Sequence, residues 1–244
     1  KPFKKIGCKV LGVDPAKNIN NKVKNINTLT SFFDYNVSKK IKKKYQSFDL
    51  IFARNVIPHN DNVNSIIKGF SNLMVDDSLG AIEFHYAGKI LEENHYDSIY
   101  HEHIYYFTIR TIEKILNKHF LHIFDCKKSP ISGGSIIIYF KKKKLKKSQK
   151  LISLLKIEKS KKFNEIETWK NFGINCIKHS KNLQKKLNDI VKITSEKVVG
   201  YGASARSSTM LNYARINNKQ ISHILDKNSL KDNHYTAGSQ IKII

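Results

Sequence analysis

The stretch Lys9-Val10-Leu11-Gly12-Val13-Asp14-Pro15 is a short apolar run closed by an acid and a proline. A buried parallel strand typically ends in this way. Further strands and helices are predicted in alternation, with strands at 28–33, 48–53 and 79–84 and helices at 37–45 and 63–73. This alternation predicts an α/β fold, a Rossmann-like sheet with helices on both faces that binds ligands beyond the carboxyl ends of its strands.

The pattern changes after an irregular stretch that we place at 85–107. A helix is predicted at 109–118, followed by an antiparallel hairpin of strands 121–126 and 135–140. Apolar residues at helical spacing from about 164 to 195 predict a connecting helix. A second strand-turn-helix-strand pattern from 197 to 226 predicts half of another Rossmann-like domain, and both ends of the chain look cut.

The charge of the chain is strongly basic, with a formal net charge of +24. Such a charge is typical of proteins that bind nucleic acid. However, only four basic residues are arginine, the residue best suited to reading bases and phosphates, while lysine is spread over the whole sequence. We therefore interpret the lysines, including the run 141–147, as a solvated surface that favours an anionic nucleotide substrate and no nucleic-acid partner.

The sequence shows no sign of a membrane or disulfide-bonded protein. No apolar stretch approaches the roughly 20 residues of a membrane span, and the N-terminus lacks a secretory signal. The three cysteines form no CxxC pair and are odd in number. We expect a cytoplasmic protein without a cysteine-based metal site.

Two polar loops follow predicted strands. Asp14 ends the first strand, where a carboxylate can bind the vicinal hydroxyls of a ribose or can simply be a solvated turn residue. The loop 54–61 follows another strand, so that Asn55 and His59 would face the same crevice. A single loop histidine is more often only solvated.

The densest polar cluster is Tyr96-Asp97-Ser98-Ile99-Tyr100-His101-Glu102-His103-Ile104-Tyr105-Tyr106. Histidine can move a proton near neutral pH, a carboxylate can orient it, and a tyrosine hydroxyl can stabilise an oxyanion, which are the groups that enolisation requires. His-x-His in an extended segment could instead bind a metal, and structural hydrogen bonding is a third interpretation.

The segment Gly200-Tyr201-Gly202-Ala203-Ser204-Ala205 fits a loose GxGxxA turn, with Asp226 at the end of the next strand. Glycines allow a backbone turn to approach phosphate, and the amides at the start of a helix donate hydrogen bonds. The turn therefore predicts a phosphate-bearing ligand, and tight packing of strand on helix without a ligand is the alternative.

Five motifs together resemble the nucleotide-sugar C-methyltransferase family, and the match spans nearly the whole chain. The motifs are Gly12–Ala16, Ala53–His59, Tyr96–His103, Ser132–Ser135 and Gly200–Thr209. The resemblance implies a class I S-adenosylmethionine-dependent enzyme that methylates the carbon next to a ketone in a deoxysugar linked to thymidine diphosphate. It implies a methyltransferase domain at 1–145, a helical connector at 146–196 and a partial Rossmann-like C-terminal domain at 197–244.

The resemblance also implies residue roles. His103 would be the general base, and the catalytic group would comprise His103, Glu102, Tyr100, His59 and Asn55. The cofactor S-adenosylmethionine would be bound by Asp14, Pro15, Arg54 and Asn55. The nucleotide sugar would be bound by Tyr96, His101, Gly202, Ser204, Arg206 and Ser207.

This sequence departs from the family pattern at its start, where the glycine-rich cofactor loop and the zinc-binding cysteine module are absent. We expect zinc only in such an N-terminal domain, and the chain as given to bind the cofactor poorly. The alternatives are a nicotinamide-dependent oxidoreductase that uses the Gly200–Ala205 turn, and a basic nucleic-acid-binding module.

Overall fold

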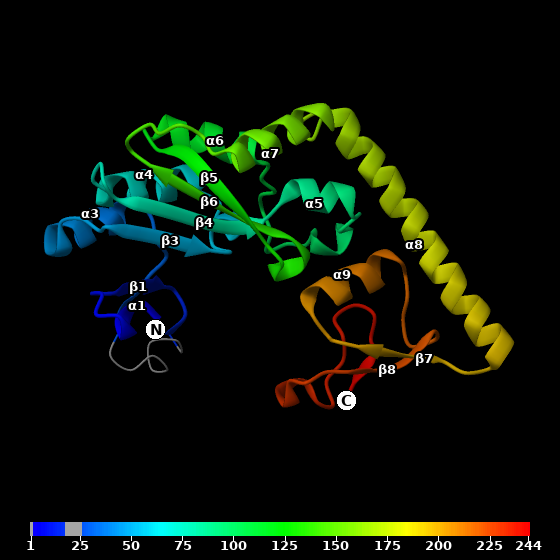
Figure 1. Cartoon of the computed structure of the whole chain (residues 1–244). Coiled ribbons are helices and arrows are strands. Elements are labelled where there is room, and N and C mark those ends of the chain that lie inside the picture. Colours follow the sequence, from blue (N-terminus) through cyan, green and yellow to red (C-terminus); the bar gives the residue numbers. More distant parts are fainter. Residues whose placement is uncertain (1, 18–25) are drawn as a thin grey trace. The chain divides into compact units, whose positions relative to one another are not determined.

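The computed structural model describes residues 2–17 and 26–244, which fall into two compact units (Figure 1). The first unit comprises 1–84, 109–129 and 135–155. The second comprises 85–108, 130–134 and 156–244. The predicted domain boundaries at 145 and 196 therefore stay a prediction, since the contacts group the segment 85–108 with the C-terminal part of the chain.

A four-stranded mixed sheet forms the centre of the first unit. Its order is β3-β4-β6-β5, and the strands are β3 (Leu50–Arg54), β4 (Leu79–His85), β6 (Ser135–Lys141) and β5 (His122–Ser129). β3 and β4 are parallel, whereas β5 and β6 form the predicted antiparallel hairpin, with His122 opposite Lys141. These strands confirm the predicted ones, with ends shifted by at most three residues.

Among the described residues, three helices of at least ten residues lie wholly in this unit, namely α3 (Tyr35–Tyr45), α4 (Val63–Leu73) and α6 (Ile109–Lys118). The four-residue α1 (Pro2–Lys5) precedes them. α3 and α4 begin at side-chain caps, because Asp34 accepts the N–H of Val37 at 2.6 Å and Asn62 accepts the N–H of Ser65 at 3.0 Å. The core consists of apolar side chains spaced three and four residues apart on the helices, together with inward residues of the strands. Its fully buried members include Ile66, Ile67, Ile82, Phe84, Ile109, Ile112, Leu116 and Phe140.

The N-terminal strands depart from the predicted single sheet. β1 (Leu11–Asp14) and β2 (Asn27–Thr30) pair in parallel in a two-stranded sheet of their own. Within the described residues, neither strand is hydrogen-bonded to β3. A short apolar run predicts a strand but carries no information about which strand lies beside it. For this reason the sequence did not show that β1 and β2 form a separate sheet.

The second unit contains a three-stranded parallel sheet, β7 (Val198–Tyr201), β8 (Ile221–Leu225) and β9 (Lys242–Ile243), in that order. The helix α9 (Ala205–Tyr213) follows β7, within the predicted strand-turn-helix-strand pattern. The long helix α8 (Ile166–Thr194) confirms the helix predicted from about 164 to 195. Its Leu183 and Leu187 pack against the buried core of this sheet.

Several helices in the described part of the chain were not predicted. The stretch 85–107 contains α5 (Ala87–Glu92) and the single-turn η2 (Tyr96–Ser98), and α7 (Gln149–Ser160) precedes α8. α5 has only six residues and no side-chain cap, so the sequence gives no helical period. No helix in the described ranges is long and apolar enough to cross a membrane, and within those ranges Cys8, Cys126 and Cys176 form no disulfide bond.

Candidate functional site

The loop after β3 is held by a buried acid on the neighbouring strand. Asn55 adopts the left-handed conformation, with φ of 50°, and its N–H donates to the carbonyl of Glu83 at 2.9 Å. The Nε of Arg54 lies 3.0 Å from the Glu83 carboxylate. Glu83 is only 8% exposed, and within the described residues its second carboxylate oxygen has no hydrogen-bond partner. Glu83 thus contacts both Arg54 and Asn55 of this predicted cofactor loop.

Asp14 and Pro15 lie at the carboxyl end of β1, as predicted. Oδ1 of Asp14 accepts the N–H of Ala16 at 2.8 Å, which stabilises the turn. A carboxylate has lone pairs for further donors, so binding of a ribose by Asp14 stays a prediction. His59 ends η1 (Ile57–His59) and is exposed, and its assignment to the catalytic group also stays a prediction.

His103 is held by two oxygen atoms in the second unit. Its Nδ1 lies 3.0 Å from the carbonyl oxygen of Ser98, and its Nε2 lies 3.3 Å from the hydroxyl of Tyr100. A carbonyl oxygen only accepts, so neutral His103 carries its proton on Nδ1 and presents a basic Nε2. The Tyr100 hydroxyl then donates to Nε2. We call this pair the Tyr100–His103 dyad.

The other residues of the segment differ in exposure. Burial, followed by the charge of Glu102, raises the pKa of Tyr100, so its hydroxyl keeps its proton at neutral pH. His101 and Glu102 are exposed, whereas Tyr106 is partly buried and its hydroxyl donates to the Ser98 carbonyl at 3.4 Å. In the described part of the chain, no group of three histidine, cysteine, aspartate or glutamate side chains is arranged to hold a metal ion.

An ion pair joins helix α9 to the start of the segment 96–106. Nε and Nη2 of Arg206 lie 2.8 and 2.7 Å from Oδ2 of Asp97. The ring of Tyr96 packs on the ring of Tyr213 at 5.1 Å, and its hydroxyl lies 3.0 Å from Nδ1 of His179. Burial raises the pKa of Tyr96 to about 12. The structure thus brings two predicted substrate-binding residues, Tyr96 and Arg206, close to the Tyr100–His103 dyad within the second unit.

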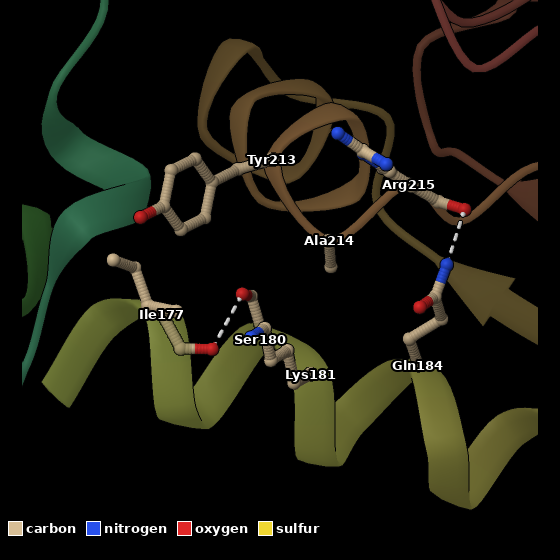
Figure 2. Close-up of a pocket in the computed structure, with 7 residues that line it drawn as sticks. All are labelled: Ile177, Ser180, Lys181, Gln184, Tyr213, Ala214 and Arg215. Atoms are coloured by element: carbon tan, nitrogen blue, oxygen red, sulfur yellow. Dashed lines mark hydrogen bonds between the residues drawn. The ribbon is translucent and has the colours of Figure 1, made fainter. Parts of the chain in front are cut away.

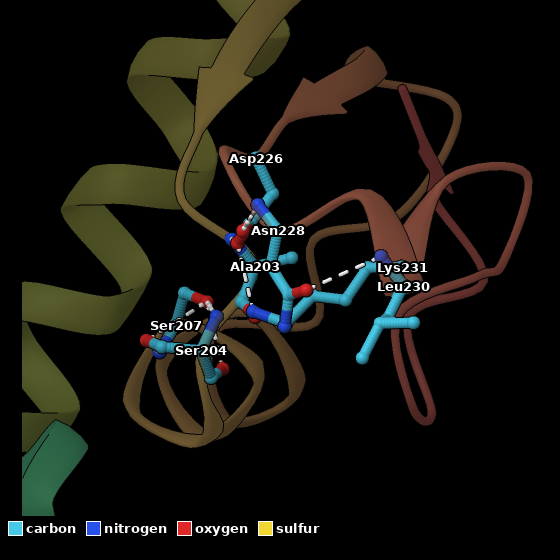
Figure 3. Close-up of polar contacts among 7 residues, drawn as sticks. All are labelled: Ala203, Ser204, Ser207, Asp226, Asn228, Leu230 and Lys231. Atoms are coloured by element: carbon cyan, nitrogen blue, oxygen red, sulfur yellow. Dashed lines mark hydrogen bonds and ion pairs between the residues drawn. The ribbon is translucent and has the colours of Figure 1, made fainter.

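The glycine turn after β7 is stabilised by contacts within the chain (Figure 3). Gly202 has a φ of 89°, which favours glycine, and the N–H of Ala203 donates to Oδ2 of Asp226 at 2.8 Å. Lys231 binds the same oxygen at 2.8 Å, and the N–H of Asn228 donates to Oδ1 at 2.9 Å. Both oxygens of Asp226 therefore serve the turn itself, which weakens the case for Asp226 as the acid of a dinucleotide site.

Ser204 and Ser207 form a reciprocal cap at the start of α9 (Figure 3). The N–H of Ser207 donates to the Ser204 hydroxyl at 3.1 Å, and the N–H of Ser204 donates to the Ser207 hydroxyl at 2.8 Å. Such a cap starts a helix without any ligand. Substrate binding by Gly202, Ser204 and Ser207 therefore stays a prediction, with a structural role already visible.

The Asp226 carboxylate makes the stability of this turn depend on pH. The hydrogen bond from Lys231 is the main cause that lowers the pKa of Asp226 from 3.8 to about 2. A lowered pKa stabilises the folded state above the unfolded-state value, so we expect this contribution to be complete above about pH 4 and lost as the pH falls towards 2. Urea unfolding of wild type and Asp226→Asn between pH 2 and 6 measures it.

As the pH falls from 6 to 2, the difference in unfolding free energy between wild type and Asp226→Asn should become smaller. Asp232→Asn, a change of a nearby exposed acid, serves as the control and should not reproduce this pattern. A gap that stays constant from pH 6 to pH 2 would contradict the ion-pair explanation.

A hollow of about 280 Å³ lies between α8 and the end of α9 (Figure 2). Its lining residues are Ile177, Ser180, Lys181, Gln184, Tyr213, Ala214 and Arg215. The amide of Gln184 donates to the carbonyl of Arg215 at 3.3 Å and joins the two helical segments. None of the predicted site residues lines this hollow, although Tyr213 contacts Tyr96.

Three polar residues near the predicted site were not identified from the sequence. Glu83 and His85 lie on β4, and His95 follows α5. Glu83 and His85 could have been noticed as polar side chains in an otherwise apolar strand. Such side chains are rarely buried unless they are paired or hydrogen-bonded. His95 stands in a stretch of irregular pattern and gave no comparable signal.

Two family models match the chain. Residues 1–120 match a model described as methyltransferase domain, and residues 130–244 match one described as C-methyltransferase C-terminal domain. The N-terminal part of the chain is therefore similar to a methyltransferase domain, and the C-terminal part to the C-terminal domain of C-methyltransferases.

A relative of the chain is C-methyltransferase NovU from Streptomyces niveus, which is 25% identical over 99% of this chain. The chain spans 58% of that relative's length. Among solved structures, PH0226 protein from Pyrococcus horikoshii OT3 is 14% identical, with a TM-score of 0.42 over 58% of this chain and 75% of the other. A SAM-dependent methyltransferase from Anabaena variabilis is 16% identical, with a TM-score of 0.43 over 57% and 70%. Both TM-scores are below 0.5, so neither structural likeness carries an argument. The similarity to methyltransferases rests on the two family models and on NovU.

Proposed function

We propose that this protein is an S-adenosylmethionine-dependent C-methyltransferase that acts next to the ketone of a nucleotide-linked deoxysugar. The observation that carries the proposal is the Tyr100–His103 dyad, in which the basic Nε2 faces a proton donor. The two family models and NovU support methyl transfer to carbon. The sugar substrate rests on the resemblance in the sequence motifs.

The residues present fit the cofactor at Asp14. A half-buried carboxylate at the end of a parallel strand is suited to accept hydrogen bonds from the two ribose hydroxyls. We propose that Asp14 and Pro15 hold the ribose end of the cofactor and that Arg54 and Asn55, braced by Glu83, line the same loop. When bound, the cofactor supplies an electrophilic methyl group.

The proposed reaction begins with proton removal by His103. Nε2 takes the proton from the carbon next to the ketone, and the electron pair of that C–H bond passes into the enolate. The Tyr100 hydroxyl, whose 3.3 Å hydrogen bond to Nε2 is long, moves its donation to the enolate oxygen and frees Nε2. One oriented donor of this kind lowers an oxyanion barrier by roughly 3 kcal/mol.

The Ser98 carbonyl has two roles in this proposal. Its hydrogen bond with Nδ1 fixes the tautomer of His103 that can accept a proton at Nε2. The same bond stabilises the imidazolium that forms, because a carbonyl oxygen lies against its positively charged N–H. With the cofactor bound, the enolate carbon would accept its methyl group as the sulfur–methyl bond breaks and the electron pair of that bond stays on the sulfur of the departing S-adenosylhomocysteine. His103 would then pass its proton to solvent.

Ligand binding and product mass test the proposal. The intact protein should bind S-adenosylmethionine, not NAD(P), and should add a methyl group to a 4-keto-6-deoxyhexose linked to thymidine diphosphate. Mass spectrometry locates the methyl group on carbon. Binding of a nicotinamide dinucleotide without S-adenosylmethionine binding would favour an oxidoreductase, and salt-dependent binding of DNA or RNA alone would favour a nucleic-acid-binding module.

A further inference from the structure

Among the residues that the structure describes, three buried polar atoms between positions 85 and 98 have no hydrogen-bond partner. They are Nε2 of His85, Nδ1 of His95 and Oγ of Ser98. Buried polar atoms in proteins are nearly always paired, so each exception requires an explanation such as a ligand or a water molecule. His85 is the most informative of the three, because it is 7% exposed and lies beside His103 and Arg206, which both act on its charge.

The surroundings of His85 form a compact group, which we call the imidazole cluster and define as His85, His95, Asp97, Gly133 and Arg206. The rings of His85 and His95 lie 5.7 Å apart. Gly133 has a φ of 80°, and a Cβ placed on it would come within 3.4 Å of His95 and 3.3 Å of Arg206. The positive φ favours glycine at this position, and the loop lies close to both His95 and Arg206.

The charges of the imidazole cluster favour an uncharged hydroxyl group over a phosphate as the ligand. Burial and, after it, the positive charge of Arg206 lower the pKa of His85 to about 4. His95 and His103 lower this pKa further, whereas Asp97 raises it. The ring of His85 is therefore neutral at physiological pH. The charge of Arg206 is compensated by Asp97. A neutral imidazole offers one donor and one acceptor, which suits a hydroxyl group better than a phosphate.

We propose that His85 is a substrate-binding residue whose free Nε2 forms a hydrogen bond with a hydroxyl group of the sugar, beside the Tyr100–His103 dyad. This inference rests on the proposed function. His95 and Gly133 shape the wall of the site, and Arg206 with Asp97 joins that wall to helix α9. In the free protein the unpaired nitrogen is a cost to stability that the substrate relieves.

Two substitutions of His85 separate binding from folding. His85→Phe removes the hydrogen bond and keeps a ring, whereas His85→Gln keeps an amide near the position of Nε2. We expect His85→Phe to weaken binding of a 4-keto-6-deoxyhexose linked to thymidine diphosphate by about 10- to 100-fold, and His85→Gln to restore part of the affinity. Calorimetry at pH 7.5 measures the dissociation constants.

Two further measurements give readouts that a merely structural role would not produce. Binding of thymidine diphosphate alone and of S-adenosylmethionine should be unchanged in both variants, because the contact is to the sugar. The melting temperature of ligand-free His85→Phe should equal or exceed that of wild type, because the substitution removes an unpaired buried atom. His119→Phe, which changes a histidine in the first unit, is the matched control and should leave sugar binding unchanged.

Each outcome decides between the possibilities. Equal sugar affinity in wild type and His85→Phe overturns the inference, as does an equal loss of affinity for thymidine diphosphate, since the contact would then be to phosphate. A fall in melting temperature in both variants together with loss of all ligands also overturns it. If wild type binds the sugar and His85→Phe does not, the inference holds even where no methyl transfer is found, and only the proposed function fails.

Discussion

His103→Asn is expected to lower the rate of methyl transfer by roughly 1,000-fold while leaving the affinity for S-adenosylmethionine unchanged. General-base catalysis contributes about 10²- to 10⁴-fold, and asparagine can keep the bond to the Ser98 carbonyl but cannot take a proton. The loss corresponds to about 4 kcal/mol of barrier height. Single-turnover kinetics with labelled cofactor measure the rate, and calorimetry measures the affinity.

Solvent exchange isolates the proton-transfer step. In D₂O and without cofactor, the wild-type protein should exchange the hydrogen next to the ketone for deuterium, which NMR detects, and His103→Asn should not. Tyr100→Phe should retain partial exchange, because Nε2 remains and only the oxyanion donor is lost. His119→Asn is the control. Wild-type exchange in His103→Asn would refute the assignment of His103 as the base.

The alternation of strands and helices was enough to predict most of the fold. The predicted bounds of α4 and α6 were confirmed to the residue, because both helices present an apolar stripe of helical period. The separate pairing of β1 with β2 was mispredicted, since strand pairing depends on contacts between segments distant in sequence. α5 was missed because six residues are too few to show a period.

The candidate site could be predicted in part for similar reasons. The dense Tyr-His-Glu-His motif identified the segment that carries His103, and the structure adds that Ser98 fixes its tautomer. Asp14 and Asn55 lie in the first unit and His103 in the second, so their sharing of one pocket stays a prediction. His85 could not be identified, because its significance comes from an unpaired atom and from Arg206, which lies 121 positions further along the chain.

Phe140→Ala is expected to destabilise the protein by about 3–5 kcal/mol, the usual cost of removing a buried phenylalanine ring. Phe140 on β6 is fully buried, and its ring lies directly over Gly80, where an added Cβ would come within 2.1 Å of Cε2. Because glycine has no side chain that could fill the space, the cavity should persist and the cost should lie at the upper end. Urea unfolding followed by circular dichroism measures the change.

Phe120→Ala is the matched control for this prediction, because Phe120 is the same residue type in the same unit and is 76% exposed. Its substitution should change the free energy of unfolding by no more than about 0.5 kcal/mol. A second variant, Gly80→Ala, places a methyl group against the Phe140 ring and should also destabilise, because a packed core tolerates added volume poorly. If Phe140→Ala and Phe120→Ala unfold alike, the ring of Phe140 on β6 does not pack against Gly80 of β4 as described.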